Sequence, residues 1–160
     1  MSDPDTREGW RPDQRHIPHS LAIGMRMIEA AGGVALMCVP YDARLVGNPA
    51  TGVLHGGVIT SVLDSASGAA VGSALGGSGW RPIATLDLRI DYMKPAAPGR
   101  DVMARAECYK VTRNVAFVRG VAYHDDPSDP IATTVATFML STPGRDASEG
   151  KGQSPPGRTK

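Results

Sequence analysis

The stretch HGGVITSVLDSASGAAVGSAL, residues 55–75, decides how the rest of the chain is read. Apolar or small residues recur in it at three- and four-residue steps, which is helical spacing with almost no solvent face. These positions are Val58, Ile59, Val62, Leu63, Ala66, Ala69, Ala70, Val71, Ala74 and Leu75. A helix of this kind is buried on nearly all sides, so the sequence predicts one long helix at the centre of the fold.

A single carboxylate interrupts this apolar helix. Asp64 is the only side chain between Arg44 and Arg81 that is formally charged at neutral pH. Burying an ionised carboxylate without a partner is costly, so Asp64 is either hydrogen-bonded, protonated or retained for chemistry. The residues that share its polar stripe, at three- and four-residue steps, are all small: Gly57, Thr60, Ser61, Ser67 and Gly68. Small neighbours leave room for a cleft beside the acid.

The two ends of the chain differ in composition from its middle. Residues 1–15 and 141–160 are rich in Pro, Gly, Ser and charged residues and have almost no apolar periodicity, which is typical of flexible tails. We therefore expect one folded domain over residues 16–140, which is enough chain for a single hydrophobic core.

Composition argues against several classes of function. The net charge is +1, and no cluster of Lys and Arg is interleaved with aromatic residues, so nucleic-acid binding is not expected. No basic start precedes an apolar N-terminal stretch and no membrane-spanning window stands out, so we expect a cytoplasmic protein with no membrane contact. Cys38 and Cys108 lie in apolar runs as expected of buried thiols, and neither they nor the histidines have metal-ligand spacing.

The remaining segments alternate as β-strands do. Residues 19–41 predict a short helical turn and then two strands that meet at Gly32–Gly33. Residues 84–95 alternate so that Leu86 and Tyr92 share one face and Thr85 lies on the other. Further strands are expected within residues 101–112, 115–124 and 130–140. The prediction is an α+β fold in which about six mainly antiparallel strands wrap the helix.

The order of these elements resembles the hotdog-fold acyl-CoA thioesterases, specifically the PaaI-like (4-hydroxybenzoyl-CoA thioesterase-related) family. The resemblance rests on NPATGVLHGG at residues 48–57, on the acid eight residues after the first glycine of the pair, and on TLDLRIDYMKPAAPG and ATFML at residues 85–99 and 136–140. It implies hydrolysis of an acyl-CoA or acyl-carrier thioester by a homodimer or a dimer-of-dimers tetramer. CoA is then part of the substrate, and no separate cofactor is implied.

The resemblance also assigns site residues. The family's oxyanion-hole amide falls on Gly56, preceded by His55, and its catalytic carboxylate falls on Asp64. Thr85 takes the place of a hydroxyl residue that orients the attacking water, and Asn48 that of a polar loop residue. For three of these a structural role is the alternative: His55 as a helix-entry residue that bonds a loop carbonyl, Thr85 as a cross-strand partner, and Asn48 as a turn residue.

These residue types suit thioester cleavage. The reaction passes through a tetrahedral oxyanion, and an unpaired N–H at a helix N-terminus is a suitable donor to it, with glycine allowing close approach. A carboxylate in an apolar helix is a stronger base toward water, and it can also attack the thioester directly to form an anhydride. The sequence leaves these two routes open.

Substrate contacts are expected at Gly57 and, for the phosphates of CoA, at Arg89, Lys94 and Arg113, unless these cations are merely solvated. Two other functions stay open. One is a hotdog hydratase or dehydratase in which His55 and Asp64 act on an enoyl or hydroxyacyl thioester. The other is a module that binds acyl thioesters without turnover.

The spacing of the two principal site residues has a geometric consequence. Eight residues separate Gly56 from Asp64, which is about 12 Å along a helix that rises 1.5 Å per residue. One thioester carbonyl cannot meet both groups, so we expect each site to combine Gly56 of one chain with Asp64 of another across a two-fold axis.

Overall fold

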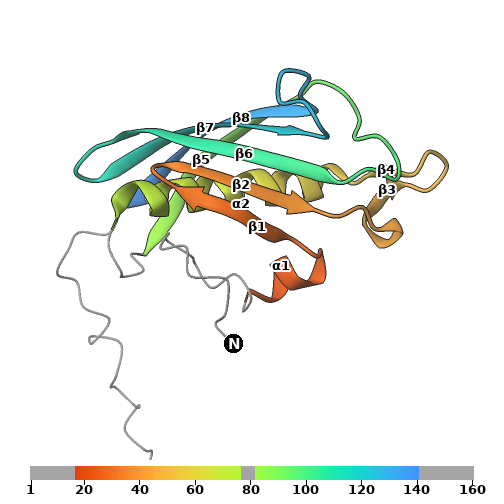
Figure 1. Ribbon diagram of the computed structural model, residues 1–160, viewed down its shortest axis with the longest axis horizontal. Helices are drawn as coiled ribbons and strands as arrows, with labels where there is room; N and C mark the ends of the chain where they lie inside the picture. The colour runs from red at the N-terminus through yellow and green to blue at the C-terminus, as the bar shows by residue number, and fades with distance from the viewer. Residues whose placement is uncertain (1–16, 77–81, 141–160) are drawn as a thin grey trace, which may run out of the picture.

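The computed structural model describes residues 17–76 and 82–140, and both predicted tails lie outside these residues. Within them a six-stranded antiparallel sheet, in the order β1-β2-β6-β7-β8-β5, curves around the helix α2 (Gly56–Leu75) (Figure 1). This is the predicted hotdog arrangement, and the helix has the predicted bounds.

The first part of the chain forms one edge of the sheet. A short helix, α1 (Pro18–Ala22), leads into the hairpin of β1 (Arg26–Ala31) and β2 (Val34–Val39), as predicted. Gly32 and Gly33 make its turn at positive φ, the conformation that glycine adopts most readily. A 3-10 helix, η2 (Ala43–Leu45), and a small hairpin, β3 (Val46–Asn48) with β4 (Val53–Leu54), fill the loop before α2. The sequence pattern did not predict this small hairpin.

The four strands after α2 complete the sheet. They are β5 (Ile83–Tyr92), β6 (Val102–Val111), β7 (Val115–Tyr123) and β8 (Ala132–Leu140). β6 pairs with β2, whereas β5 pairs only with β8 and becomes the second edge of the sheet. Several buried residues of β6 and β7 are small, among them the fully buried Ala104, Ala106 and Ala122, which lets these strands approach α2 closely.

By length and mean hydropathy, 1.3, α2 would also qualify as a membrane span, contrary to the sequence prediction. Its packing is that of a core helix, because it contacts all six strands of the curved sheet, most extensively β2 and β6. The expectation of no membrane contact stays a prediction.

The strict alternation predicted for β5 is wrong. A bulge in the pairing with β8 places Thr85 opposite Phe138 but Asp87 opposite the next residue, Thr137. Leu86 is the extra residue and is 52% exposed. Because a bulge shifts side-chain alternation by one residue, Thr85 lies on the helix-facing side of β5.

The helix is also less enclosed than its composition predicts. The curved sheet does not close, and the two edge strands leave a stripe of α2 partly uncovered. On this stripe Gly57 is exposed and Thr60, Ser61 and Asp64 are half-buried, with His19 of α1 3.0 Å from the Ser61 hydroxyl. Ser67, which was expected on this stripe, is instead fully buried and donates to the Leu63 carbonyl at 2.7 Å.

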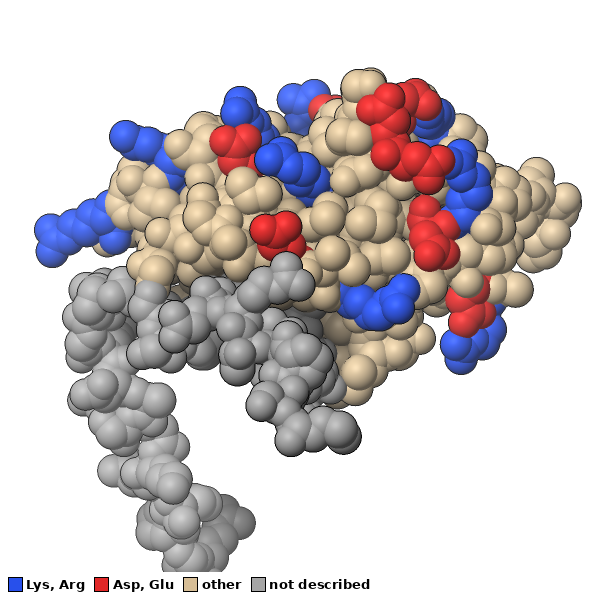
Figure 2. Space-filling view, viewed as in Figure 1, with Lys and Arg blue, Asp and Glu red and all other residues tan. Residues whose placement is uncertain are grey.

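Charges are mixed on the surface. Figure 2 shows basic and acidic side chains lying beside one another on the face that it presents, not gathered by sign. Several form exposed ion pairs, including Arg119 with Glu107 at 3.1 Å and Arg100 with Asp125. Exposed pairs of this kind contribute little to stability. That the protein does not bind nucleic acid remains a prediction.

Candidate active site

The N-terminus of α2 presents one backbone amide without a protein acceptor. His55 is the N-cap, and its Nδ1 accepts a hydrogen bond from the Gly57 N–H at 2.9 Å, while its carbonyl accepts from the Val58 N–H. Among the described residues, nothing accepts from the Gly56 N–H. An unpaired amide at the positive end of a 20-residue helix is a suitable donor to an oxyanion.

The role of His55 differs in detail from the structural alternative considered above. The imidazole bonds the helix itself, through the Gly57 amide, and not a loop carbonyl. Since Nδ1 accepts that bond, the ring proton of the neutral imidazole lies on Nε2. His55 is exposed, and no described residue is bonded to its Nε2.

The two glycines after His55 differ in the space available for a side chain. Neither has a positive φ. A Cβ on Gly57 would lie 2.8 Å from Nδ1 of His55 and would displace the cap, whereas a Cβ on Gly56 would make an ordinary 3.4 Å contact with the Tyr92 hydroxyl oxygen. Gly57 therefore serves the cap of the helix, and the structure shows no separate substrate-binding role for it.

The structure brings Asp64 and Thr85 together, two residues that the resemblance assigned to the site. The Thr85 hydroxyl donates to Asp64 Oδ1 at 3.0 Å, which the bulge in β5 makes possible. Asp64 Oδ2 has no partner among the described residues and is free to hold a water. The expectation that Asp64 is fully buried is wrong for the single chain, because the uncovered stripe of α2 leaves this carboxylate half-buried.

The two halves of the candidate site lie apart on one chain. α2 is continuous from Gly56 to Leu75, so the Gly56 amide and the backbone of Asp64 are separated by about 12 Å along the axis. The structure thus brings His55 to Gly56, and Thr85 to Asp64, but does not bring one pair to the other.

Asn48 has a structural role in a turn, and its place in the catalytic site stays a prediction. Its Oδ1 accepts from the Ala50 N–H at 3.0 Å, and its carbonyl accepts from the Thr51 and Gly52 amides, which builds the turn between β3 and β4. The side chain is exposed and makes no hydrogen bond to the other candidate residues.

The three candidate phosphate contacts are dispersed. Lys94 follows β5 close to the start of α2 and is paired with Asp129. Arg89 is on the outer face of β5, paired with Asp91 at 3.1 Å. Arg113 lies in the β6–β7 turn, beside the end of the sheet where Ile83 pairs with Leu140, so the length of β5 separates it from the Tyr92 end. Only Lys94 adjoins Gly56.

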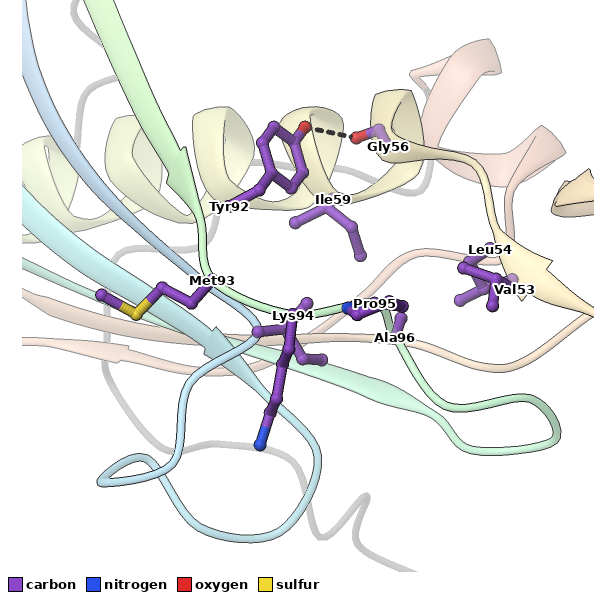
Figure 3. Close-up of a pocket in the computed structure, with 10 residues that line it drawn as sticks. Val53, Leu54, Gly56, Ile59, Tyr92, Met93, Lys94, Pro95 and Ala96 are labelled. Atoms are coloured by element: carbon purple, nitrogen blue, oxygen red, sulfur yellow. Dashed lines mark hydrogen bonds between the residues drawn. The ribbon is translucent and has the colours of Figure 1, made fainter.

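A pocket of about 370 Å³ opens beside Gly56 (Figure 3). Its walls are largely apolar: Val53, Leu54, Gly56, Ile59, Tyr92, Met93, Lys94, Pro95, Ala96 and Ile131. Sequence reasoning did not single out Tyr92, although an aromatic residue on the helix-facing side at the very end of a strand is a usable signal.

The loop that lines this pocket is held by a second residue that the sequence did not suggest. His124 Nε2 accepts from the Ala97 N–H at 2.9 Å, and its Nδ1 donates to the Asp101 carbonyl at 2.7 Å. One neutral imidazole thus holds the β5–β6 connection at two points, Ala97 and Asp101.

Sequence comparison with known proteins shows the family of the chain. The sequence profile described as the Thioesterase superfamily matches residues 51–131, from the β3–β4 turn to the start of β8. The chain belongs to the thioesterase superfamily. The predicted family and the predicted class of enzyme, a thioester hydrolase, are thereby confirmed.

Three known proteins are similar to this chain over most of their length. The medium/long-chain acyl-CoA thioesterase YigI of Escherichia coli is 32% identical over 136 residues, which cover 78% of this chain and 86% of YigI. A solved protein from Pseudomonas aeruginosa is 45% identical with a TM-score of 0.67, covering 76% of this chain and 88% of that one. A mutant of the phenylacetic acid degradation protein PaaI from Thermus thermophilus is 26% identical with a TM-score of 0.66, covering 77% and 98%. The hotdog fold follows from these likenesses as well as from the topology.

Proposed function

We propose that this thioesterase hydrolyses medium- or long-chain acyl-CoA to the free acid and CoA. The observation that carries the proposal is the unpaired Gly56 amide at the head of the central helix, directly beside an apolar pocket. An oxyanion donor next to an apolar cavity is what an acyl thioester requires of a hydrolase.

The pocket supports an alkyl acyl group. Side chains such as Leu54, Ile59 and Ile131 offer no hydrogen bonds, and each buried methylene of an acyl chain gains about 0.8 kcal/mol. Lys94 at the same pocket provides a cation for a phosphate of CoA. The name of YigI, which specifies medium and long chains, favours the same substrate class.

The proposed chemistry uses Asp64 as a general base. A water held by Oδ2 attacks the thioester carbonyl carbon and gives its proton to the carboxylate, while Thr85 keeps Oδ1 occupied and the carboxylate oriented. The carbonyl oxygen becomes an oxyanion that accepts from the Gly56 N–H. Collapse breaks the C–S bond, and the proton passes to the departing sulfur. Direct attack by Asp64 to form an anhydride is the alternative.

We further propose that the site is completed by a second copy of the chain. The 12 Å between Gly56 and Asp64 prevents one thioester from using both in one chain, whereas an antiparallel partner helix brings each Gly56 to the other chain's Asp64. The uncovered stripe of α2 supports this dimer, as does the long edge strand β5 with its exposed Leu86 and Tyr92.

A panel of acyl-CoA esters with a thiol reagent tests the proposal. We expect rapid thiol release from saturated medium- and long-chain esters and slower release from short-chain, benzoyl and phenylacetyl esters. Hydration of an enoyl ester without thiol release would favour the hydratase, and tight binding without any turnover would favour the binding module. A cytoplasmic location and the lack of a cofactor or metal remain predictions.

One labelling experiment tests for an anhydride that is hydrolysed at the Asp64 carbonyl. In a single turnover in ¹⁸O-water with excess enzyme, a general base leaves Asp64 unlabelled, whereas hydrolysis of an anhydride at the Asp64 carbonyl places ¹⁸O in that side chain. We expect no label in the peptide that contains Asp64.

A further inference from the structure

The hydroxyl of Tyr92 reaches back from the end of β5 to the first turn of α2. Its oxygen lies 2.8 Å from the Gly56 carbonyl oxygen, to which it donates (Figure 3). The Thr60 hydroxyl is close to both groups, 2.9 Å from the Tyr92 oxygen and 3.2 Å from the Gly56 carbonyl. Tyr92 from the strand and Thr60 from the helix therefore meet at the carbonyl of Gly56, the residue whose N–H is the candidate oxyanion donor.

This contact and the His55 cap act on the same peptide group. The peptide between Gly56 and Gly57 has its carbonyl held by Tyr92 and its N–H held by His55 Nδ1. Two consecutive glycines give the backbone unusual freedom, and amides in a first helical turn have no intrahelical acceptor. Holding both ends of this peptide restrains the adjoining Gly56 N–H, because the two peptide planes meet at the Gly56 Cα.

We propose that Tyr92 is a positioning residue that aims the Gly56 N–H at the developing oxyanion. The inference rests on the proposed function for its catalytic meaning, but the restraint on the peptide can be measured without turnover. An oxyanion donor is effective only when it is oriented before the reaction, so a loose Gly56–Gly57 peptide would lower kcat more than it raises KM.

The hydrogen bonds that the Tyr92 and Thr60 hydroxyls can donate determine how much kcat falls in each variant. Tyr92 and Thr60 have one hydroxyl proton each. The Tyr92 proton serves the Gly56 carbonyl, and the shorter of the two Thr60 contacts, 2.9 Å, is to the Tyr92 oxygen. In a Tyr92→Phe variant the Thr60 hydroxyl is released to the Gly56 carbonyl and compensates in part. Removal of both hydroxyls then has the larger effect.

Because Tyr92 is exposed, a positioning role for its hydroxyl can be distinguished from a role in stability. The residue is 52% exposed at the end of an edge strand, so its hydroxyl contributes little to the folded core. Phenylalanine keeps the ring that lines the pocket and removes only the hydroxyl. The control is Tyr109→Phe, since Tyr109 is also about half exposed, at 53%, and its hydroxyl makes no hydrogen bond among the described residues.

The experiment compares Tyr92→Phe, Tyr92→Phe/Thr60→Val and Tyr109→Phe. We expect kcat on the best acyl-CoA to fall about 5- to 10-fold in the single variant and further in the double variant, with KM changed less than about 2-fold. Tyr109→Phe should match the unmodified protein. An unchanged kcat in both Tyr92 variants, or a rise in KM alone, would overturn the proposal.

A second readout is independent of activity. In the ¹³C-labelled protein, loss of the Tyr92 hydroxyl should shift the Gly56 carbonyl resonance and speed hydrogen exchange at the Gly57 amide, whereas Tyr109→Phe should change neither. If both signals stay unchanged, Tyr92 does not hold this peptide and the inference is wrong. If they change while no acyl-CoA is hydrolysed by the unmodified protein, the proposed function fails and the peptide restraint stands.

Discussion

Within residues 17–76 and 82–140, Asp64 has one carboxylate oxygen without a protein partner, while Thr85 occupies the other. We predict that Asp64→Asn folds and binds acyl-CoA but lowers kcat by about 100-fold or more, because removing a general base or nucleophile typically costs that much.

The measurement is kcat by thiol release, together with the melting temperature and the affinity for a non-hydrolysable acyl-CoA thioether. Thr85→Val is the matched control, since it removes the orienting hydroxyl and leaves the base, and its loss should be much smaller. More than half of the original rate in Asp64→Asn would remove Asp64 from the mechanism.

The surroundings of Cys38 and Cys108 change the acidity of their thiols. Desolvation by burial raises the pKa of the Cys38 thiol and that of the Cys108 thiol above the ordinary value of 9.0. Both thiols therefore stay protonated at neutral pH, where only the thiolate is a good nucleophile. We predict that iodoacetamide labels the folded protein far more slowly than the urea-unfolded protein at pH 8.

The raised pKa of the two thiols also makes the stability of the folded protein depend on pH. The unfolded thiols ionise first as pH rises, so this contribution to stability is complete below pH 9 and is lost as pH rises through the folded pKa values. Equal labelling rates in the folded and unfolded protein would contradict the burial of Cys38 and Cys108.

At the scale of one element, the start of α2 depends on the His55 cap, and this cap leaves no room for a side chain at Gly57. A Cβ on Gly57 would lie 2.8 Å from His55 Nδ1, so Gly57→Ala displaces the cap of the helix. We predict that this variant is destabilised by about 1 kcal/mol, the usual cost of a lost N-cap, despite the better helix propensity of alanine.

Gly68→Ala is the control on the same helix. A Cβ there would make ordinary contacts at 3.7 and 3.8 Å with Ile83 and Phe138, so alanine should be neutral or stabilising by about 0.5 to 1 kcal/mol. Urea unfolding of both variants checks the pair. A Gly57→Ala protein as stable as Gly68→Ala would mean that His55 does not stabilise the helix.

At the scale of the whole molecule, the proposed dimer requires each chain to supply two half-sites, Gly56 to one and Asp64 to the other. We predict that an Asp64→Asn chain and a Gly56→Leu chain, each nearly inactive, regain activity after subunit exchange. In a mixed dimer one site has both defects and the other has neither, so an equal mixture should reach about a quarter of the original activity.

The control mixes the Asp64→Asn chain with a chain that has both substitutions, from which no intact site can form. A Gly56→Leu side chain also meets Tyr92, so its fold is checked by the melting temperature. No recovery after exchange has been verified by mass spectrometry, or full activity in a monomer, would show that each chain builds its own site.

Much of this molecule was predictable from local pattern. The helix over residues 56–75 was found with its bounds, because its side chains are nearly all apolar and it begins at a glycine pair. The β1–β2 hairpin and the three last strands also followed from alternation and turn residues, since both signals act within a few residues of the chain. The family resemblance assigned Asp64 and Thr85 to the site, and their catalytic roles stay predictions.

Other features were decided only by tertiary structure. The bulge that turns Thr85 toward Asp64 arises from the register of β5 against β8, which no alternation within β5 reveals. The uncovered stripe of α2 follows from strand order, because β5 lies at the edge of the sheet and the sheet does not close. Tyr92 reaches the Gly56 carbonyl across 36 positions of sequence. Local composition determines which elements form, and long-range pairing determines which side chains meet.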